Sequence, residues 1–474
     1  MLIIMPLQGR DMQKLFEEVS SLDKHCYDAF GLSEDILMEH AAEGMALYIR
    51  QHFDTTKRVV IVCGGGNNGA DGIALARLLH GVYDVSLFFV KEAKSPMAKL
   101  QLQRANAIGV KRTIYFEECD IIVDTLFGTG FSGSLDAEQK SVMQTVNSLD
   151  AFKIACDIPS GIDSKGVCDA NTFMADVSLT MGALKRSMYS DDAKEYVGKI
   201  EVIDLGVTRM MYERSSKWHL LDEDDMKLPN RKQKNTHKGS YGHLALAQGE
   251  KFGASVLSAS AALKFGVGLV TLVGFKEINL PYSLMSASSI PHNATSLVLG
   301  MGLGEGFSEI EIDKFLDNTL PLVVDADLFS MSKICEILER ENLVITPHPK
   351  EFVSLLNLTN LADVDVKELQ ENRFKYVELF CEEFPNVVLL LKGANVIIAK
   401  EKEFYINPHG TSILAKGGSG DVLSGLIGAL LAQGYFSLEA TLFASLAHTK
   451  LAKNYTGSDF SLTPEDLIAG IGKL

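Results

Sequence analysis

The sequence predicts an α/β protein with two domains, each built around a mostly parallel sheet. Short β-rich apolar runs alternate with helical patterns over residues 58–206, and the same alternation restarts near residue 243. Between about residues 207 and 240 the alternation stops, as expected at a domain junction. Strands that alternate with helices form right-handed βαβ units and therefore parallel sheets. We place an N-terminal domain at residues 1–212 and a C-terminal domain at residues 213–474.

The composition is that of a globular protein and makes several classes of protein improbable. The chain has 474 residues, of which 46% are hydrophobic and 22% are charged, with a net charge of −16. These values argue against disordered, collagen-like and coiled-coil chains. An acidic chain is also poorly suited to phosphate backbones, so we expect no nucleic-acid partner.

Cysteine spacing and hydropathy predict the cellular context. The seven cysteines form no C-x-x-C pair, which argues against a disulfide framework and against structural zinc. The opening MLIIMPLQGR has too short an apolar run for a signal peptide, and no stretch approaches 18 apolar residues. We therefore expect a cytoplasmic protein with no membrane partner.

In the N-terminal half, apolar spacing predicts two helices within the first 51 residues, followed by alternating strands and helices. Helical spacing covers residues 11–30 and 34–51. The expected strands are residues 58–64, 84–90, 119–128, 152–161, 175–180 and 199–206. The expected intervening helices are residues 70–80, 95–108 and 136–148.

The C-terminal half repeats the pattern with different lengths. Strands are expected at residues 243–248, 269–275, 296–300, 321–326, 343–346, 387–392, 395–399 and 403–407. Helices are expected at residues 254–265, 308–318, 331–340, 349–357, 363–384, 419–433, 437–453 and 464–472. The preceding basic stretch LPNRKQKNTHKGS is either a solvated linker, which we favour for Arg231 and Lys232, or a rim that faces a phosphate ligand.

The first glycine-rich loop, GGGNNGADG at residues 64–72, joins a predicted strand to a predicted helix. Glycines let a backbone approach a ligand closely, and a helix N-terminus offers free N–H groups and partial positive charge. Five glycines and three Asn or Asp residues in nine positions are unusual for a plain turn. We therefore predict a nucleotide phosphate site here.

A second loop, GTGFSG at residues 128–133, follows the strand that carries Asp124, and Asp157 ends the next strand. The loop matches G-x-G-x-x-G but does not follow the first strand, so it need not indicate a redox dehydrogenase. Carboxylates at the carboxyl ends of parallel strands converge on the ligand crevice, although each could instead cap a helix. For Asp163, just beyond, a turn role is an equal alternative.

In the second half, GGSGDVLSG at residues 417–425 opens a helix and predicts an anion hole with Asp421 beside it. A carboxylate in that position can take a proton from a hydroxyl group that attacks phosphorus, or can simply stabilise the helix dipole. His348 in TPHPKE is either a ligand contact or a structural hydrogen-bond partner. The P-loop pattern G-x-x-x-x-G-K-[ST] is absent from the sequence.

These motifs together resemble one family over nearly the whole chain. GGGNNGADG, VDTLFGTGFSG and CDIPSGID are similar to NAD(P)H-hydrate epimerase domains, whose fold is Rossmann-like with three layers. KGSYGH, GMGLG, VVDADLF, TPHPKEF, LKGAN and KGGSGDVLSGLIGALLAQG are similar to ribokinase-like NAD(P)H-hydrate dehydratase domains. The order matches bifunctional bacterial repair enzymes.

For the first domain, the resemblance implies an epimerase site that holds the hydrated cofactor and a potassium ion. Asp157 would be the acid or base. The cofactor contacts would be Asn67, Asn68, Gly69, Ala70, Asp71, Gly128, Thr129, Gly130, Phe131, Ser132, Gly133, Ser134 and Asp157. The potassium ligands would be Asn68, Asp124 and Ser160, which suit a hard cation.

For the second domain, the resemblance implies a dehydratase site with ADP as co-substrate, with or without Mg²⁺. Asp421 would be the general base. The hydrate contacts would be Ala254, Gly302, Gly304, His348 and Asp421. The ADP contacts would be Lys392, Gly393, Ala394, Asn395, Val396 and Gly420.

The implied chemistry repairs NAD(P)H to which water has added at C6. The first domain would interconvert the R and S epimers, through ring opening or dehydration. The second would phosphorylate the hydroxyl group of the S epimer from ADP, releasing AMP and then phosphate. Two alternatives stay open: a kinase for a small alcohol or vitamin precursor, and a non-catalytic nucleotide-binding scaffold. We also expect a homo-oligomer.

Overall fold

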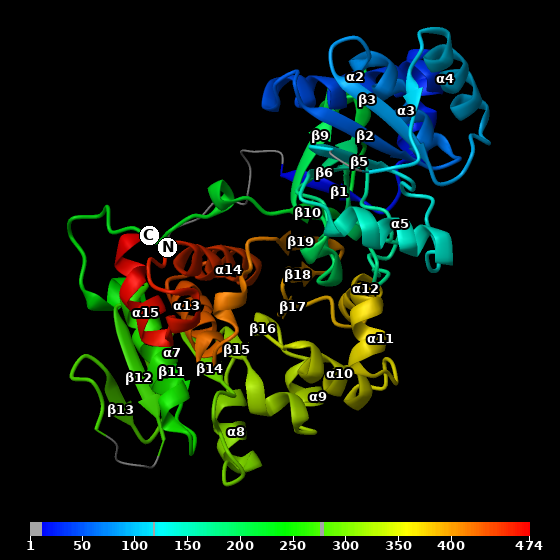
Figure 1. Cartoon of the computed structure of the whole chain (residues 1–474). Helices are drawn as coiled ribbons and strands as arrows, with labels where there is room; N and C mark the ends of the chain where they lie inside the picture. The colour runs from blue at the N-terminus through cyan, green and yellow to red at the C-terminus, as the bar shows by residue number, and fades with distance from the viewer. Residues whose placement is uncertain (1–11, 117–118, 275–278) are drawn as a thin grey trace. The chain divides into compact units, whose positions relative to one another are not determined.

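The computed structural model describes residues 12–116, 119–274 and 279–474 (Figure 1). The described chain divides into two compact units, one from Lys14 to Trp218 and one from His219 to Leu474 that also takes in Met12 and Gln13. Each unit is an α/β body with its own sheet, which confirms the predicted fold class. The boundary predicted between residues 212 and 213 lies close to this division, and it stays a prediction of where the two activities divide.

The N-terminal unit is organised by a parallel sheet in the order β4-β3-β2-β5-β6-β7-β9. Its strands are β2 (Arg58–Cys63), β3 (Asp84–Phe89), β4 (Lys111–Arg112), β5 (Ile121–Thr125), β6 (Phe152–Cys156), β7 (Val177–Met181) and β9 (Lys199–Ile203). The central strand β2 is almost wholly apolar, as expected for a strand buried on both faces.

Helices cover both faces of this sheet and complete three layers. On β2, Ile61 packs with one helical layer, whereas its neighbour Val62 packs with Met143 of α5 on the other face. The helices are α1 (Ser20–Phe30), α2 (Glu34–His52), α3 (Asn67–Leu79), α4 (Pro96–Ala107), α5 (Ala137–Ser148) and α6 (Arg209–Tyr212). Helix α5 begins with a capping box between Asp136 and Gln139, which satisfies two backbone N–H groups.

The helix predicted over residues 11–30 is wrong in its first part. Gln13–Phe16 form a strand, β1, and the helix begins only at Ser20. Strand β1 pairs in parallel with β8 (Leu184–Lys185), so that Leu15 lies opposite Leu184. This segment pairs with a strand about 170 residues away in the sequence. A local helical pattern cannot reveal such a distant partner.

The C-terminal unit also has a largely parallel sheet, in the order β13-β12-β11-β14-β15-β16-β17-β18-β19, with antiparallel pairing only at β17-β18 and β18-β19. Its strands are β11 (His243–Ala247), β12 (Leu269–Val273), β13 (Met285–Ala287), β14 (Ser296–Leu299), β15 (Leu322–Val324), β16 (Leu343–Ile345), β17 (Val387–Leu391), β18 (Val396–Lys400) and β19 (Glu403–Asn407). Strand β10 (Trp218–Leu220) lies at the division between the units.

Helices flank this second sheet, and the apolar helix α13 packs closely against α7. The helices are α7 (Phe252–Lys264), α8 (Glu309–Leu316), α9 (Ile334–Ile337), α10 (Pro349–Leu358), α11 (Val366–Glu371), α12 (Arg373–Glu383), α13 (Ser419–Ala432), α14 (Ser437–Lys453) and α15 (Pro464–Gly470). Leu244, Val298 and Val344 share a core with α13 and α14. Helix α12 packs on β17 and β18, and its Phe380 meets Phe352 of α10 edge to face.

Two predicted helices of this unit are shorter than expected. The helix predicted at 331–340 is reduced to Ile334–Ile337. The turns on either side use hydrogen bonds between residues three apart. The two buried isoleucines are also three residues apart, a spacing that suits such turns. The helix predicted at 363–384 is interrupted at Asn372, whose side-chain amide donates to the carbonyl of Glu368. Asparagine competes with the helix backbone in this way.

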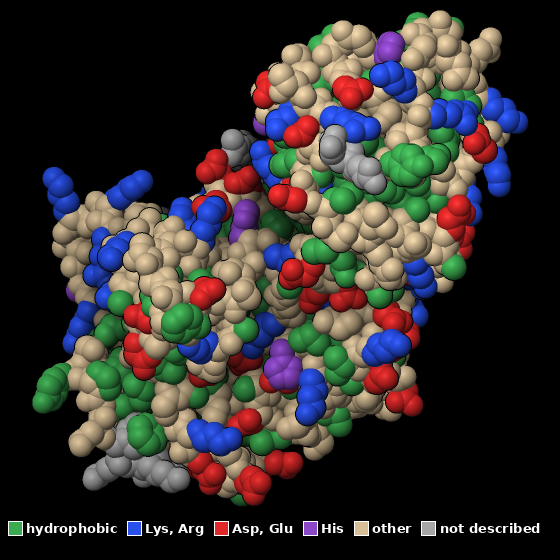
Figure 2. Space-filling view, viewed as in Figure 1, with side chains coloured by type: hydrophobic (Ala, Val, Ile, Leu, Met, Phe, Trp, Pro, Cys, Tyr) green, Lys and Arg blue, Asp and Glu red, His purple; other side chains and the backbone are tan. Residues whose placement is uncertain are grey.

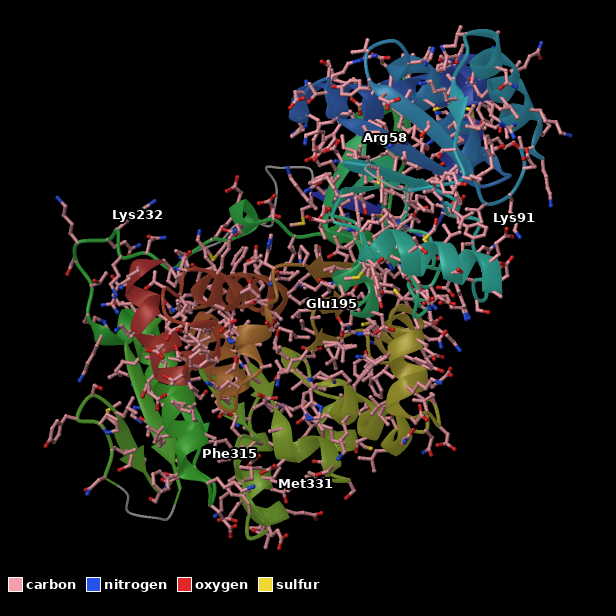
Figure 3. All side chains as sticks on the ribbon, in the orientation of Figure 1. Arg58, Lys91, Glu195, Lys232, Phe315 and Met331 are labelled. Carbon is pink, nitrogen blue, oxygen red and sulfur yellow. The ribbon has the colours of Figure 1, made fainter. Side chains whose placement is uncertain are left out.

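The basic stretch between the sheets is exposed. Lys232 lies at the surface (Figure 3), as do Lys234 and Lys238. Arg231 stacks on the ring of Tyr241 at 4.2 Å and donates to the carbonyl of Gly266. These observations fit the linker interpretation. Over the face seen in Figure 2, acidic and basic side chains are interspersed. Among the described residues, no helix combines the length and hydropathy needed to cross a bilayer.

Candidate functional sites

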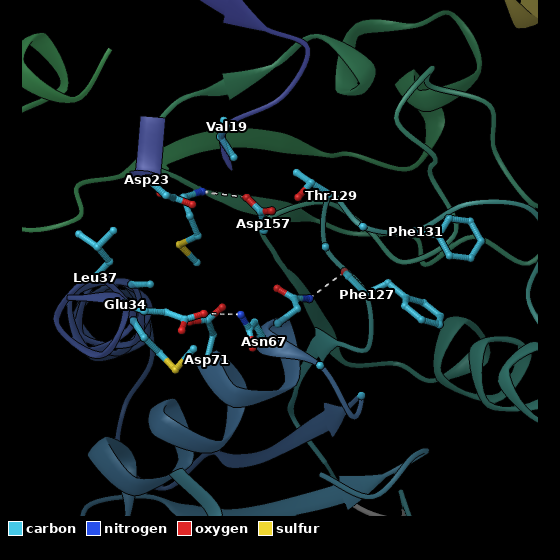
Figure 4. A pocket seen from close by; sticks show the side chains of 18 of the residues that line it. Val19, Asp23, Glu34, Leu37, Asn67, Asp71, Phe127, Thr129, Phe131 and Asp157 are labelled. Carbon is cyan, nitrogen blue, oxygen red and sulfur yellow. Dashed lines mark hydrogen bonds between the residues drawn. The ribbon is translucent and has the colours of Figure 1, made fainter. Parts of the chain in front are cut away.

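The N-terminal unit encloses a cavity of about 550 Å³ at the carboxyl ends of its strands (Figure 4). It is lined by the glycine-rich loop after β2, the start of α3, the loop after β5, Asp157 after β6, and side chains from α1, α2 and α6. Parallel sheets bind ligands at this edge because the loops after the strands converge there. Both predicted loops therefore open on one cavity.

The first loop fits against the second without room for side chains. A Cβ atom on Gly64 would lie 2.1 Å from the carbonyl oxygen of Leu126, and one on Gly69 would lie 2.0 Å from that of Gly64. The N-terminus of α3 thus faces the cavity with free N–H groups, the arrangement that favours an anion. Lys91, labelled in Figure 3, also lines the cavity and pairs with Glu138 at 2.6 Å.

Asp157 is held by a network that sequence reasoning did not find. Its Oδ1 accepts hydrogen bonds from the Lys185 ammonium at 2.5 Å and from the Met181 N–H at 3.1 Å. Lys185 is 1% exposed and also donates to the Thr180 hydroxyl and to the Met181 carbonyl. Asp157 has φ +70°, a conformation that costs energy in a non-glycine residue and is concentrated at functional sites. The carboxylate is therefore held in one orientation and lines the cavity.

Further acidic side chains line the same cavity. The hydroxyl group of Tyr212 donates to Asp23 at 2.7 Å, and the amide of Asn67 donates to Glu34 at 2.6 Å. Burial raises the pKa of Asp23, despite the hydrogen bond from Tyr212. Asp71 lines the cavity, and its pKa lies well above the ordinary value because of burial and the nearby Asp157, Asp23 and Glu34.

Oxygen atoms of Asp124, Ser160 and the carbonyl of Phe127 gather beside the cavity. Fully buried Asp124 accepts from the backbone N–H and the hydroxyl of Ser160 at 2.7 and 2.8 Å. Burial raises the pKa of Asp124 to about 6, although these bonds oppose the shift. Asn68 donates to the Phe127 carbonyl at 2.7 Å. These are oxygen donors around a buried carboxyl group, a set that fits a hard cation.

The loop after β5 contributes only part of its predicted contacts. Gly128, Thr129, Gly130 and Phe131 line the cavity. A Cβ atom on Gly128 would lie 3.2 Å from Asp157 Oδ2 and 3.4 Å from Asn68 Oδ1, so only glycine leaves this space free. The predicted contacts that do not line the cavity are Gly69, Ala70, Ser132, Gly133 and Ser134. Asp163 accepts from the N–H groups of Lys165 and Val167, which is a turn role.

In the C-terminal unit, Asp421 lies in the first turn of α13, directly after the glycine loop. Gly418 has φ +90°, and a Cβ atom there would lie 2.6 Å from Pro464 Cγ. Burial and the nearby Asp325 and Asp327 raise the pKa of Asp421 to about 6, while Lys392 opposes the shift. The free N–H groups of α13 and the Asp421 carboxyl thus occupy the same end of the helix.

Partly exposed Lys392 and buried Asp325 form an ion pair at this helix N-terminus, and sequence reasoning missed the aspartate. Lys392 Nζ donates to Asp325 Oδ1 at 2.7 Å, and the Ser424 hydroxyl donates to Oδ2 at 2.7 Å. A Cβ atom on Gly420 would lie 3.3 Å from Lys392 Nζ. The lysine therefore places its charge beside the anion hole. The motif VVDADLF contains Asp325, but the presence of an aspartate in this motif did not by itself indicate what its side chain does.

The remaining predicted hydrate contacts have structural partners. The His348 ring accepts the Glu351 N–H at 3.2 Å and caps α10, which is the structural role left open for it. Burial, aided by the Lys392 charge, lowers the pKa of His348, and burial raises that of Glu351 to about 7. Gly304 donates to Asp327 at 3.1 Å. A Cβ atom on Gly302 would lie 3.2 Å from that of Ala254, so these two predicted contacts are neighbours.

A hollow of about 360 Å³ lies near the β17-β18 loop and is a feature that sequence reasoning missed. It is lined by His409, Thr411, Ile413, Ala452, Lys453, Tyr455, Gly457 and Asp459. A Cβ atom on Gly410 would lie 2.4 Å from the carbonyl of Ala394, which places the hollow beside the predicted ADP loop. Lys416, just before the glycine loop, donates to the carbonyl of Phe460 at 2.7 Å. This bond joins the start of the glycine loop to the segment that contains the lining residue Asp459.

The fold and the two sites define a two-domain α/β protein with a glycine-rich anion site and an adjacent aspartate in each domain. Comparison with family models matches residues 34–187 to the YjeF-related protein N-terminus and residues 245–472 to NAD(P)H-hydrate dehydratase.

Full-length relatives carry the same two parts. The chain is 43% identical to the bifunctional NAD(P)H-hydrate repair enzyme Nnr of Helicobacter pylori, over 98% of this chain and 100% of the relative. It is 30% identical to the enzyme of the same name from Dictyoglomus turgidum, over 95% and 96%. An ADP/ATP-dependent NAD(P)H-hydrate dehydratase from Bacillus subtilis, crystallised with ATP and Mg²⁺, is 25% identical with a TM-score of 0.46, covering 53% of this chain and 95% of that one. The chain belongs to the family of bifunctional NAD(P)H-hydrate repair enzymes, which confirms the resemblance and favours it over a vitamin-precursor kinase.

Proposed function

We propose that the protein repairs hydrated NAD(P)H, with an epimerase in the N-terminal unit and a nucleotide-dependent dehydratase in the C-terminal unit. The relatives named for this repair cover the whole chain. The observation that carries the proposal is the pairing of an anion-binding helix N-terminus with one adjacent aspartate in each unit, Asp157 in the first and Asp421 in the second.

In the epimerase site, Asp157 is the base that takes the proton of the C6 hydroxyl group. Lys185 orients this carboxylate through a hydrogen bond of 2.5 Å from its buried ammonium group. The start of α3 and Lys91 bind the pyrophosphate of the cofactor. Asn68, Asp124 and Ser160 would hold a potassium ion, which would supply positive charge beside the substrate.

In the dehydratase site, Asp421 takes the proton of the C6 hydroxyl group as its oxygen attacks the terminal phosphorus of the nucleotide. The N–H groups of Gly418 and Gly420, together with Lys392, stabilise the charge on the transferred group. Phosphorylation turns the hydroxyl group into a better leaving group. Its departure as phosphate restores the reduced nicotinamide.

The nucleotide, ADP in our proposal, extends from the glycine loop along residues 392–396 into the hollow at Tyr455. Ile413, Ala452 and Tyr455 offer apolar surface to a base, and His409 and Thr411 offer polar groups at its edge. Mg²⁺ would arrive on the nucleotide phosphates. The homo-oligomer and the absence of a nucleic-acid or membrane partner stay predictions.

The test is a coupled absorbance assay with the full-length protein. Hydrated NADH is mixed with ADP or ATP, and the absorbance of reduced nicotinamide is followed. Recovery of all of the R and S mixture is expected with nucleotide present. Recovery of the S epimer alone would reject the epimerase, and no recovery with either nucleotide would reject the dehydratase.

A further inference from the structure

The epimerase cavity holds four carboxyl groups among its described lining residues, and three of them already have a hydrogen-bond partner. Asp157 is held by Lys185, Asp23 by Tyr212 and Glu34 by Asn67. For Asp71, no partner occurs among the described residues, although its side chain lines the cavity from the second turn of α3 (Figure 4). A partly exposed carboxyl group that faces a cavity without a partner in the protein is open to contact with a ligand.

Epimerisation at C6 needs a proton donor as well as a base. The hydroxyl group at C6 is attached to the carbon next to the ring nitrogen, so the ring can open to an aldehyde if N1 receives a proton. Asp157, paired with an ammonium, is suited to accept a proton but not to donate one at the same moment. The donor must therefore come from another group that faces the cavity.

We propose that Asp71 is this donor, a second catalytic residue of the epimerase that works with Asp157 through ring opening; the inference rests on the proposed function. The two side chains come from different elements, α3 and the end of β6, and face the same cavity. The charged groups around Asp71 are Asp157, Asp23, Glu34 and Lys185. Three carboxyl groups near one ammonium already leave a surplus of negative charge, and a protonated Asp71 adds no further charge to it. Pairs of titratable groups whose surroundings drive their protonation apart are typical of acid–base sites.

The step balances without a cofactor. Asp157 takes the proton of the C6 hydroxyl, the C6–O bond becomes a carbonyl, and the C6–N1 bond breaks with its electron pair on N1. N1 takes the proton of Asp71. Rotation about the C5–C6 bond turns the other face of the aldehyde to N1. Closure then reverses the transfers: N1 attacks C6, Asp71 recovers its proton, and Asp157 returns its proton to the oxygen.

The first experiment compares wild-type protein with Asp71→Asn. Purified S epimer is incubated with full-length protein without nucleotide, and the appearance of the R epimer is measured by chromatography. Loss of a general acid should lower kcat about 100-fold, with KM changed less than about twofold because asparagine keeps the shape of the side chain. Asp84→Asn, at the exposed start of β3, is the matched control and should retain the wild-type rate.

Wild-type kcat in Asp71→Asn, or a change in KM alone, would overturn the proposal. Asp71→Glu keeps a carboxyl group and should retain more activity than Asp71→Asn; equal loss in both would also count against proton donation. If the wild-type protein itself did not interconvert the epimers, the proposed epimerase function would fail, which separates that failure from failure of the role of Asp71.

The second experiment needs no variant. The S epimer is prepared with oxygen-18 in its C6 hydroxyl group, and the R epimer formed by wild-type protein is examined by mass spectrometry. Ring opening keeps the C6–O bond, so the label should remain in the product. Loss of the label to water would show that the oxygen does not stay on C6 during the conversion, either because the hydroxyl group leaves or because a released aldehyde is hydrated. Either result would overturn the step as proposed, in which the same oxygen stays on C6 and recovers its proton from Asp157.

Discussion

The two aspartates that we propose as catalytic lie in contrasting surroundings. Asp157 receives bonds from Lys185 and a backbone N–H, and its backbone has a φ of +70°. Asp421 has no hydrogen-bond partner among the described residues, and its nearest named charges act at longer range. The carboxylate of the first site is thus oriented by the protein alone, whereas we propose that Asp421 gains its partners from the substrate and nucleotide. Loss of either carboxylate should therefore affect stability differently, although both losses should stop a reaction.

The largest effect is expected for Asp421→Asn. Loss of the base should lower the rate of dehydration about 1000-fold, while ADP still binds because its phosphates contact backbone N–H groups. The rate is measured with S epimer and ADP by absorbance, and ADP affinity by calorimetry. Asp317→Asn, an exposed position at the end of α8, serves as the control. A variant that turns over at the wild-type rate would remove Asp421 from the chemistry.

Lys185→Met should damage both activity and stability in the first unit. Because Lys185 is 1% exposed, its loss leaves a buried carboxylate without its cation, which should lower the free energy of unfolding by about 3 kcal/mol. Chemical denaturation measures this change. The double variant Lys185→Met/Asp157→Asn should recover part of the lost stability, since no charge is then left unpaired; additive losses would show that the two groups do not interact.

A pH profile of dehydration should reveal the raised pKa of Asp421. The base must be ionised, and its pKa is about 6. The ionised fraction therefore falls as the pH drops below about 6, and kcat/KM for the S epimer should fall about tenfold per pH unit there. Initial rates at saturating ADP between pH 5 and 8 give the profile. A flat profile down to pH 5 would contradict the assignment of Asp421 as the base.

The smallest effect is expected for Gly128→Ala. The added methyl group would lie 3.2 Å from Asp157 Oδ2 and would occupy space in front of the carboxylate. Epimerisation should slow about tenfold through displacement of the substrate, with little change in the melting temperature and none in dehydration. An unaltered rate would show that the substrate does not approach this carboxylate past Gly128.

Much of the fold and part of each site could be predicted because their signals are local. Asp124 lies near the end of a strand, Asp157 follows a strand, and Asp421 lies in the first turn of a helix. Each is next to glycine-rich sequence, and such positions converge by the geometry of parallel sheets. Lys185, Asp23 and Tyr212 gave no such signal. Asp23 and Tyr212 are 189 residues apart and meet only in the folded unit. The strand β1 was missed for the same reason, since its partner β8 is equally remote.

The contact between Gly418 and Pro464 ties the phosphate-binding turn to the last helix of the chain. Because Pro464 fills the space beside the glycine, α15 supports the left-handed conformation of the turn. A stop codon placed just before α15 would thus leave Asp421 and every proposed nucleotide contact in the polypeptide. It would, however, remove the helix that packs against the glycine turn. Dehydration of the S epimer should then be lost although no proposed catalytic residue is removed, while interconversion of the epimers by the other unit should continue.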